Sequence, residues 1–297
     1  MVSASLTRAH GLWWGLVGVV AFSFTVPFTR VAVEGLSPLF IGSARAVVAA
    51  GLAVAALAVT RTRRPRARQW ARLAVVGAGV VVGFPLLTSY ALTTTPASHA
   101  AVVIALVPAA TAMMAVLRGH ERPPTAFWVV AGLGAVAAVG FASVQGGGWG
   151  SLHRADLLLF AAVLAAAVGY AEGGLLAREL GAWQTVSWAL VLCAPFMVGL
   201  ALTSAIRHSP SASPVQWAAF AYLGVVSMYL GFFAWYRGLA IGPMAQVSQV
   251  QLVQPVLSLC WAGLLLGEHL TLGTIGGGLA VVLCTGAAVR VRLAKAD

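Results

Sequence analysis

Two stretches decide how this chain folds: LTTTPASHAAVVIALVP at residues 92–108 and LAIGPMAQVSQVQLVQP at residues 239–255. The second begins 147 residues after the first, and the same shift places Gln246 on His99 and Glu268 on Glu121. In both stretches a short break is followed by a proline and an apolar segment with a second proline, and a glutamate comes 13 residues after each stretch ends. The chain therefore contains an internal repeat, a feature of many membrane transporters.

The composition around these stretches is that of a membrane protein. Of the 297 residues, 60% are hydrophobic and 8% are charged, whereas about a quarter of the residues are charged in a typical soluble domain. So few charges cannot cover a globule of this size, and most of the apolar surface must face hydrocarbon. Soluble enzymes, disordered tails and fibrous proteins are excluded as classes.

Apolar runs of about 20 residues, the length of one membrane crossing, can be counted along the whole chain. There are ten, at residues 12–34, 37–60, 70–92, 96–117, 125–143, 155–178, 182–206, 215–240, 243–266 and 271–292. They are long and do not alternate, which favours helices over a β-barrel. We predict an all-α integral membrane protein with ten transmembrane helices, in two five-helix repeats at 12–143 and 155–292 that form one structural unit. Because five is odd, the repeats are predicted to be inverted, as in secondary transporters.

The basic residues predict the orientation. With both termini in the cytoplasm, fourteen of the 18 lysines and arginines fall in inside loops and three fall outside. This asymmetry follows the positive-inside rule and predicts a multi-pass protein of the bacterial plasma (inner) membrane. Six arginines lie in RTRRPRARQWAR at residues 61–72, a short loop between two apolar runs. A net charge of +11 would suggest a nucleic-acid partner in a soluble protein, but the position of these arginines between apolar runs argues against it.

Several short motifs, in this order, resemble the EamA family of the drug/metabolite transporter superfamily. They are Arg30, the turn EGLSPL at 34–39, Arg45, and in the second half WYRGL at 235–239 and LGEHLT at 266–271. The resemblance extends from about residue 12 to residue 290. It implies an inner-membrane exporter of small metabolites, often amino acids, with a cavity lined mainly by helices 1, 3, 4, 6, 8 and 9. The YddG-type aromatic amino-acid exporters of this family are similar in size and topology.

Glu172 is the acid that lies well inside an apolar run. A carboxylate at the centre of a membrane helix costs about 2.5–3.5 kcal/mol on insertion scales, so it needs a partner, water or a cavity. Glu172 is therefore a candidate to bind a substrate amino group or to couple transport to a proton; a structural pairing with Arg178 is the alternative. His99, the repeat-mate of Gln246, is a second candidate, with a structural hydrogen bond as its alternative.

The ninth run carries polar side chains, with Gln246, Gln251, Gln254 and Ser258 on one face of the expected helix. Amides are costly against lipid, so this face is predicted to line a cavity or, alternatively, to bind neighbouring helices. Aromatic residues inside the runs can stack on a planar substrate. The candidate substrate-binding residues are Phe24, Tyr90, His99, Tyr170, Glu172, Trp235, Gln246, Gln251 and Gln254.

Three prolines lie inside predicted helices, where each removes a backbone hydrogen bond. Pro27, Pro108 and Pro255 are therefore candidate hinges. Two expectations concern charges near helix ends. Arg30, Glu34 and Arg45 are expected to form an outer charge cluster that orders the first two helices. Glu121 and Glu268, at helix ends, are expected to form local ion pairs or caps with Arg122 or His269.

These observations predict a secondary or facilitative transporter that exports small metabolites by alternating access, with amino acids, aromatic amino acids among them, as the expected substrates. The alternatives are a proton-coupled exporter of cationic drugs or other metabolites, and a non-transporting membrane scaffold. No cofactor, metal or catalytic residue is expected, because the chain has no P-loop, no metal-ligand spacing and no clustered nucleophile and base. The expected partners are a small-molecule substrate and the lipid bilayer. The sequence does not predict an oligomeric state, and a monomer is one candidate.

Overall fold

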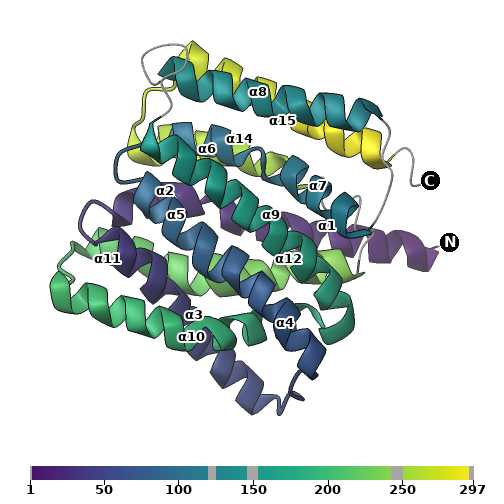
Figure 1. The fold of residues 1–297 in the computed structure, drawn as a ribbon, viewed down its shortest axis with the longest axis vertical. Helices are drawn as coiled ribbons and strands as arrows, with labels where there is room; N and C mark the ends of the chain where they lie inside the picture. Colours follow the sequence, from purple (N-terminus) through teal and green to yellow (C-terminus); the bar gives the residue numbers. More distant parts are fainter. Residues whose placement is uncertain (1, 120–124, 146–152, 242–249, 294–297) are drawn as a thin grey trace.

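A computed structural model describes residues 2–119, 125–145, 153–241 and 250–293. The described residues form helices and no strand (Figure 1). The first repeat contains α1 (Val2–Ser23), α2 (Thr25–Ala32), α3 (Pro38–Val59), α4 (Ala67–Val76), η1 (Gly77–Gly83), α5 (Phe84–Ala91), α6 (Ala97–Ile104), α7 (Val107–Gly119) and α8 (Thr125–Gln145). The second contains α9 (Arg154–Leu180), α10 (Ala182–Arg207), α11 (Pro214–Tyr222), η2 (Leu223–Leu230), α12 (Gly231–Ile241), α14 (Val253–Leu266) and α15 (Leu272–Leu293).

Most of these elements join into membrane-crossing segments. Among the described residues, eight helical segments are long and apolar enough to cross a membrane, and α14 and α15 contribute two shorter apolar helices. The prediction of an all-helical, ten-helix membrane protein is confirmed. The first and fourth predicted helices are each divided in two, because breaks separate α1 from α2 and α6 from α7. Residues 242–249 at the start of the ninth predicted helix lie outside the described residues.

Helices of one repeat pair with helices of the other. The α3 helix packs along α10, α1 along α12, and α8 along α15, while α5 and η1 pack on α9 and α6 packs on α14. Figure 1 shows α8 with α15 and α3 with α10 at opposite sides of the bundle. If each helix is replaced by its equivalent in the other repeat, the α3–α10, α6–α14 and α8–α15 pairs map onto themselves. The α1–α12 pair then maps onto the α5–α9 pair. The two repeats therefore interlock in a pseudo-symmetric arrangement.

The third span of each repeat contains a stretch of π-helix. These stretches are η1 (Gly77–Gly83) and η2 (Leu223–Leu230), and the repeat shift of 147 carries η1 onto residues 224–230. A π-helix is rare and occurs often at functional sites. Its appearance at the same place in both repeats indicates that the local widening belongs to the architecture.

Small residues allow the closest helix crossings. In α12, a Cβ atom at Gly238 would stand 2.6 Å from the amide nitrogen of Gly15 and 2.9 Å from the carbonyl oxygen of Gly11. Only a glycine fits at this position, so α1 and α12 pack backbone to backbone, as small residues permit in membrane proteins.

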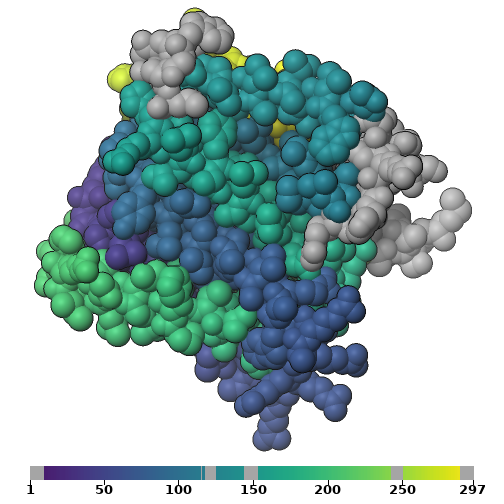
Figure 2. All heavy atoms as spheres, in the orientation of Figure 1, coloured from purple at the N-terminus to yellow at the C-terminus, as the bar shows by residue number. Residues whose placement is uncertain are grey.

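The outer surface has the two characters expected of a membrane protein. Large apolar side chains are exposed around the bundle, with Leu264 and Leu283 76% and 69% exposed, which suits contact with lipid. The segment that carries Arg61, Arg63, Arg64, Arg66 and Arg68 is exposed and projects from one end of the molecule (Figure 2).

Candidate functional site

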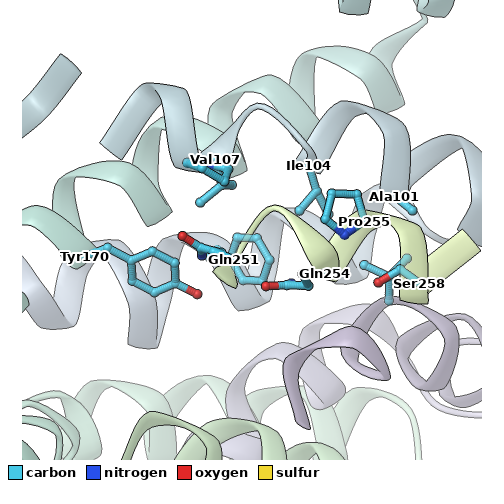
Figure 3. Close-up of a pocket in the computed structure, with 11 residues that line it drawn as sticks. Ala101, Ile104, Val107, Tyr170, Gln251, Gln254, Pro255 and Ser258 are labelled. Carbon is cyan, nitrogen blue, oxygen red and sulfur yellow. The ribbon is translucent and has the colours of Figure 1, made fainter. Parts of the chain in front are cut away.

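A pocket lies where the two repeats meet, between α2, α5, α6, α7, α9 and α14. Its lining residues are Val26, Phe84, Ala101, Ile104, Val107, Pro108, Tyr170, Gln251, Gln254, Pro255 and Ser258 (Figure 3). Both members of the opening sequence repeat supply parts of its wall. The fourth span contributes residues on either side of its break, and α14 contributes residues at its beginning.

Prolines explain why the helices are interrupted here. Pro108 is the second residue of α7 and Pro255 the third residue of α14. A proline has no N–H to donate to the carbonyl four residues earlier, so regular helix stops before it. The α6 helix accordingly ends at Ile104, and Gln251 and Leu252 form a turn before α14. Interrupted helices at membrane depth are the usual site of substrate binding in transporters built from repeats.

The first span breaks in the same way. Pro27 is the third residue of α2, and the carbonyl oxygen of Ser23, four residues earlier, accepts a hydrogen bond from Ser258 Oγ at 2.8 Å. The hydroxyl of Ser23 in turn accepts from Trp261 Nε1 at 2.9 Å. The break between α1 and α2 is thus stabilised by α14 of the other repeat, directly beside the pocket. All three candidate hinge prolines lie next to helix breaks.

Polar groups in the pocket are only partly satisfied. The side-chain oxygen Oε1 of Gln254 is buried and has no hydrogen-bond partner within the described ranges. Gln251 is 4% exposed, and the phenol of Tyr170 points toward the two glutamines (Figure 3). A buried acceptor without a donor is costly, so this wall favours a ligand that brings an N–H group.

The pocket is narrow. It leaves about 20 Å³ for the centres of water molecules, which is room for one or two waters. A ligand of amino-acid size therefore needs the α6–α7 and α14 segments to separate. The breaks beside Pro108 and Pro255 place points of flexibility at the walls that must move.

Comparisons with known proteins identify the fold family. The model of the EamA-like transporter family matches residues 9–143 and again residues 153–289. The chain belongs to the EamA-like transporter family. It is 42% identical to the uncharacterized transporter YdeK of Bacillus subtilis (strain 168) over 93% of this chain and 96% of that protein. It is 30% identical to the probable terminal-alkyne amino-acid exporter of Streptantibioticus cattleyicolor, over 92% of this chain and 91% of that protein.

A solved crystal structure supports the fold as well. It aligns with this EamA-like transporter at a TM-score of 0.64, covering 97% of this chain and 99% of its own. The two sequences are 22% identical, so this likeness speaks for the fold alone. As a family member the chain is a multi-pass membrane transporter.

Three of the candidate substrate-binding residues meet in the pocket of this EamA-like transporter. These are Tyr170, Gln251 and Gln254. Phe24 lies at the break of the first span, where it stacks on Trp261 with ring centroids 4.5 Å apart. Trp235 is 2% exposed and packs against Gly18 of α1. Tyr90 is 43% exposed and does not line the pocket. Gln246 lies outside the described residues.

Glu172 does not line the pocket either. It is 1% exposed, accepts a hydrogen bond from Arg72 of α4 and forms an ion pair with it. Arg72 also donates to Glu179. Glu172 lies two residues after Tyr170 in α9, so it points to nearly the opposite side of the helix. The cluster of Arg72, Glu172 and Glu179 joins α4 to α9 at the end of the bundle next to the arginine-rich loop.

His99 lies at the other end of α9. Its Nε2 atom is 2.7 Å from Oδ1 of Asp156, and its ring lies against Phe141. Asp156 is 2% exposed and also accepts from the backbone N–H of His153. Asp156 was not among the candidates from the sequence, because it lies at the beginning of an apolar run and not inside one. The spacing of three residues from His153 is the signal that identifies it as a helix cap.

Two expectations about charges need correction. Glu268 caps a helix, but not locally: its carboxylate accepts from the backbone N–H groups of Ala97 and Ser98 at 2.7 and 2.8 Å. It therefore stabilises the N-terminus of α6 in the other repeat. Arg30, Glu34 and Arg45 do not form an ion-paired cluster, since none of the ion pairs among the described residues involves them. Glu121 and Arg122 lie outside those residues.

Proposed function

We propose that this EamA-like transporter exports an amino acid by alternating access through the pocket between its two repeats. The observation that carries the proposal is the buried Gln254 oxygen, which has no hydrogen-bond partner among the described residues, in a mainly apolar pocket next to helix breaks. The ammonium group of an amino acid is the donor that this oxygen lacks. The relative from Streptantibioticus cattleyicolor, named as an amino-acid exporter, supports the same substrate class.

The rest of the pocket favours an apolar side chain. Val26, Ile104 and Val107 form an aliphatic wall, and Phe84 and Tyr170 add aromatic rings. Aromatic rings stack on one another in offset or edge-to-face arrangements. Phenylalanine and large aliphatic amino acids are therefore the first substrates to test.

Alternating access is supported by contacts at both ends of α9. The pair of His99 and Asp156 joins α6 to the beginning of α9, and the cluster of Arg72, Glu172 and Glu179 joins α4 to its last turns. Opening either end requires one of these sets of contacts to separate. We infer that the repeats are inverted and that the two sets close opposite sides of the membrane.

The same geometry supports a proposal for the orientation. The exposed arginine-rich loop at residues 61–68 lies at the end of the bundle that carries the Arg72 cluster. The positive-inside rule assigns this end to the cytoplasm. The protein is then an inner-membrane exporter with both termini in the cytoplasm. The contacts of Arg72 close the cytoplasmic side, from which the substrate arrives.

Glu172 remains the candidate for proton coupling, now through Arg72. A protonated Glu172 no longer attracts the Arg72 guanidinium, so protonation favours separation of α4 from α9. We expect Glu172→Gln to abolish any dependence of transport on a pH gradient. Unchanged coupling in that variant would assign the proton to another group, whereas wild-type transport that does not depend on a pH gradient would identify the protein as a facilitator.

The experiment that tests the function is counterflow in liposomes. Purified protein is reconstituted with unlabelled phenylalanine inside, labelled phenylalanine is added outside, and unlabelled amino acids serve as competitors. Loss of one hydrogen bond to a charged group costs about 1.5–3 kcal/mol, so Gln254→Leu should lower apparent affinity about tenfold or more. Val256→Leu, on the lipid-facing side of α14 at 43% exposure, is the matched control. Absence of counterflow for every amino acid tested contradicts the proposal.

A further inference from the structure

Arg45 of α3 is a charged side chain buried in the membrane-spanning bundle. It is 1% exposed, and its Nε and Nη2 atoms have no hydrogen-bond partner within the part of the chain that is described. It is the eighth residue of α3, which places it about 10 Å along the helix at a rise of about 1.5 Å per residue. A buried charge without a partner is among the costliest features of a membrane protein, and such a residue usually serves a ligand or ion path.

No acid within the described residues is seen to neutralise Arg45. Asp156 pairs with His99, while Glu172 and Glu179 pair with Arg72. The carboxylate of Glu268 binds the backbone at the start of α6. Glu34 is exposed on the loop before α3, and the two remaining acids lie outside the described residues.

Contacts of α3 show where the Arg45 side chain points. Leu86 of α5 packs against Gly42, and Val48 packs against Gly224 of η2. Arg45 lies three residues after Gly42 and three before Val48, so at about 100° per residue its side chain projects midway between these two contacts. The guanidinium is therefore directed into the space between α5 and η2.

This space adjoins the walls of the pocket. The α2 helix contacts both α5 and η2, and Thr25 Oγ1 of α2 lies 2.8 Å from Ser227 Oγ of η2. Val26 of α2 and Phe84 of α5 line the pocket. Arg45 thus projects between α5, which lines the pocket, and η2, which contacts the pocket-lining helix α2.

We propose that Arg45 is the subsite for the carboxylate of the transported amino acid. The inference rests on the proposed function, because it supplies the cation that is missing among the lining residues of the pocket: Gln254 offers an acceptor for the ammonium group, and a guanidinium binds a carboxylate through two parallel hydrogen bonds. Movement at the break beside Pro27 brings the carboxylate and Arg45 together when the pocket widens. Amines without a carboxylate leave Arg45 unpaired and are poor substrates.

The test compares pairs of compounds that differ only in the carboxylate. Phenylalanine with phenethylamine, and leucine with isoamylamine, compete against labelled phenylalanine in counterflow by wild type, Arg45→Lys and Arg45→Met. Removing one partner of a buried charge pair weakens binding about 30-fold or more. We expect Arg45→Met to lower the potency of each amino acid by that factor while the potency of each amine changes less than threefold. Arg45→Lys should keep part of the discrimination.

Thermal unfolding separates this role from a structural one. If Arg45 serves the substrate, Arg45→Met should unfold at the same or a higher temperature than wild type, because an unpaired buried charge has been removed. Arg30→Gln is the control, since Arg30 Nη1 donates to the Leu92 carbonyl at 3.0 Å and its loss should leave the discrimination unchanged.

Each outcome has one meaning. Wild-type counterflow with an unchanged ratio of amino-acid to amine potency in Arg45→Met overturns the Arg45 assignment alone. A lower unfolding temperature with unchanged discrimination assigns Arg45 to the scaffold and also overturns it. If Arg45→Met does not fold, equal discrimination by Arg45→Lys and wild type at a lower unfolding temperature has the same meaning. Absence of wild-type amino-acid counterflow overturns the proposed function and this assignment with it.

Discussion

The contacts of Arg72 provide a quantitative test of how the repeats are held together. The guanidinium donates from Nε to Glu172 and from Nη1 to Glu179. The side chains of Glu172, Arg72 and Glu179 are 2%, 22% and 47% exposed. One cation therefore joins a buried carboxylate and a half-exposed one, and the two contacts should differ in strength.

The perturbation is Arg72→Gln, which removes the guanidinium that pairs with the buried Glu172 carboxylate. Removing one partner of a buried ion pair costs about 3–5 kcal/mol. Since water reaches part of Arg72, we expect about 2–4 kcal/mol of destabilisation here. Glu179→Gln removes a contact that is open to water and should cost about 0–1 kcal/mol. The double variant Arg72→Gln/Glu172→Gln removes both charges and should recover most of the loss.

The assay is reversible unfolding in mixed micelles with increasing SDS, followed by tryptophan fluorescence at pH 7. Wild type, Arg72→Gln, Glu172→Gln and the double variant form a double-mutant cycle that isolates the coupling energy. Glu179→Gln is the matched control for an exposed partner on the same helix. A loss below about 1 kcal/mol in Arg72→Gln, or a double variant less stable than Arg72→Gln, refutes the reasoning.

Three further predictions concern the scaffold and its orientation. Ser258→Ala removes the donor to the Ser23 carbonyl at 2.8 Å and should destabilise the protein by about 1–3 kcal/mol, because that buried acceptor is left unsatisfied; SDS unfolding measures it. Gly238→Val forces α12 away from Gly15 and should lower the yield of monodisperse protein in size-exclusion chromatography. A green fluorescent protein joined to the C-terminus should fluoresce in bacteria, because that end is expected in the cytoplasm.

These predictions have simple controls. Ser258→Thr keeps the hydroxyl and should retain more stability than Ser258→Ala; equal losses would mean that the hydrogen bond is not the cause. Gly276→Val is the control for Gly238→Val, since a Cβ atom there would meet no heavy atom within 4 Å, and equal damage would contradict the packing argument. A dark C-terminal fusion to green fluorescent protein, together with an active C-terminal fusion to alkaline phosphatase, would reverse the proposed orientation.

The candidate site shows where sequence reasoning succeeded and where it stopped. The face of polar residues in the ninth run identified Gln251 and Gln254 because amides are costly against lipid, and the structure brings both into one pocket with Tyr170. The same reasoning could not place Tyr90 or Trp235, because an aromatic side chain is equally stable in packing, at lipid or in a cavity.

The sequence by itself determined the class of this protein. Long apolar runs, few charges and an internal repeat are local or periodic features, and the membrane allows only a few structures for them. The tertiary structure decided which polar groups meet. Arg72 lies 100 residues from Glu172 and Glu268 lies 171 from Ala97, and no spacing along the chain encodes such contacts. They depend on which helices pack together, and that choice rests on many weak contacts between small and apolar side chains that are nearly alike in every helix.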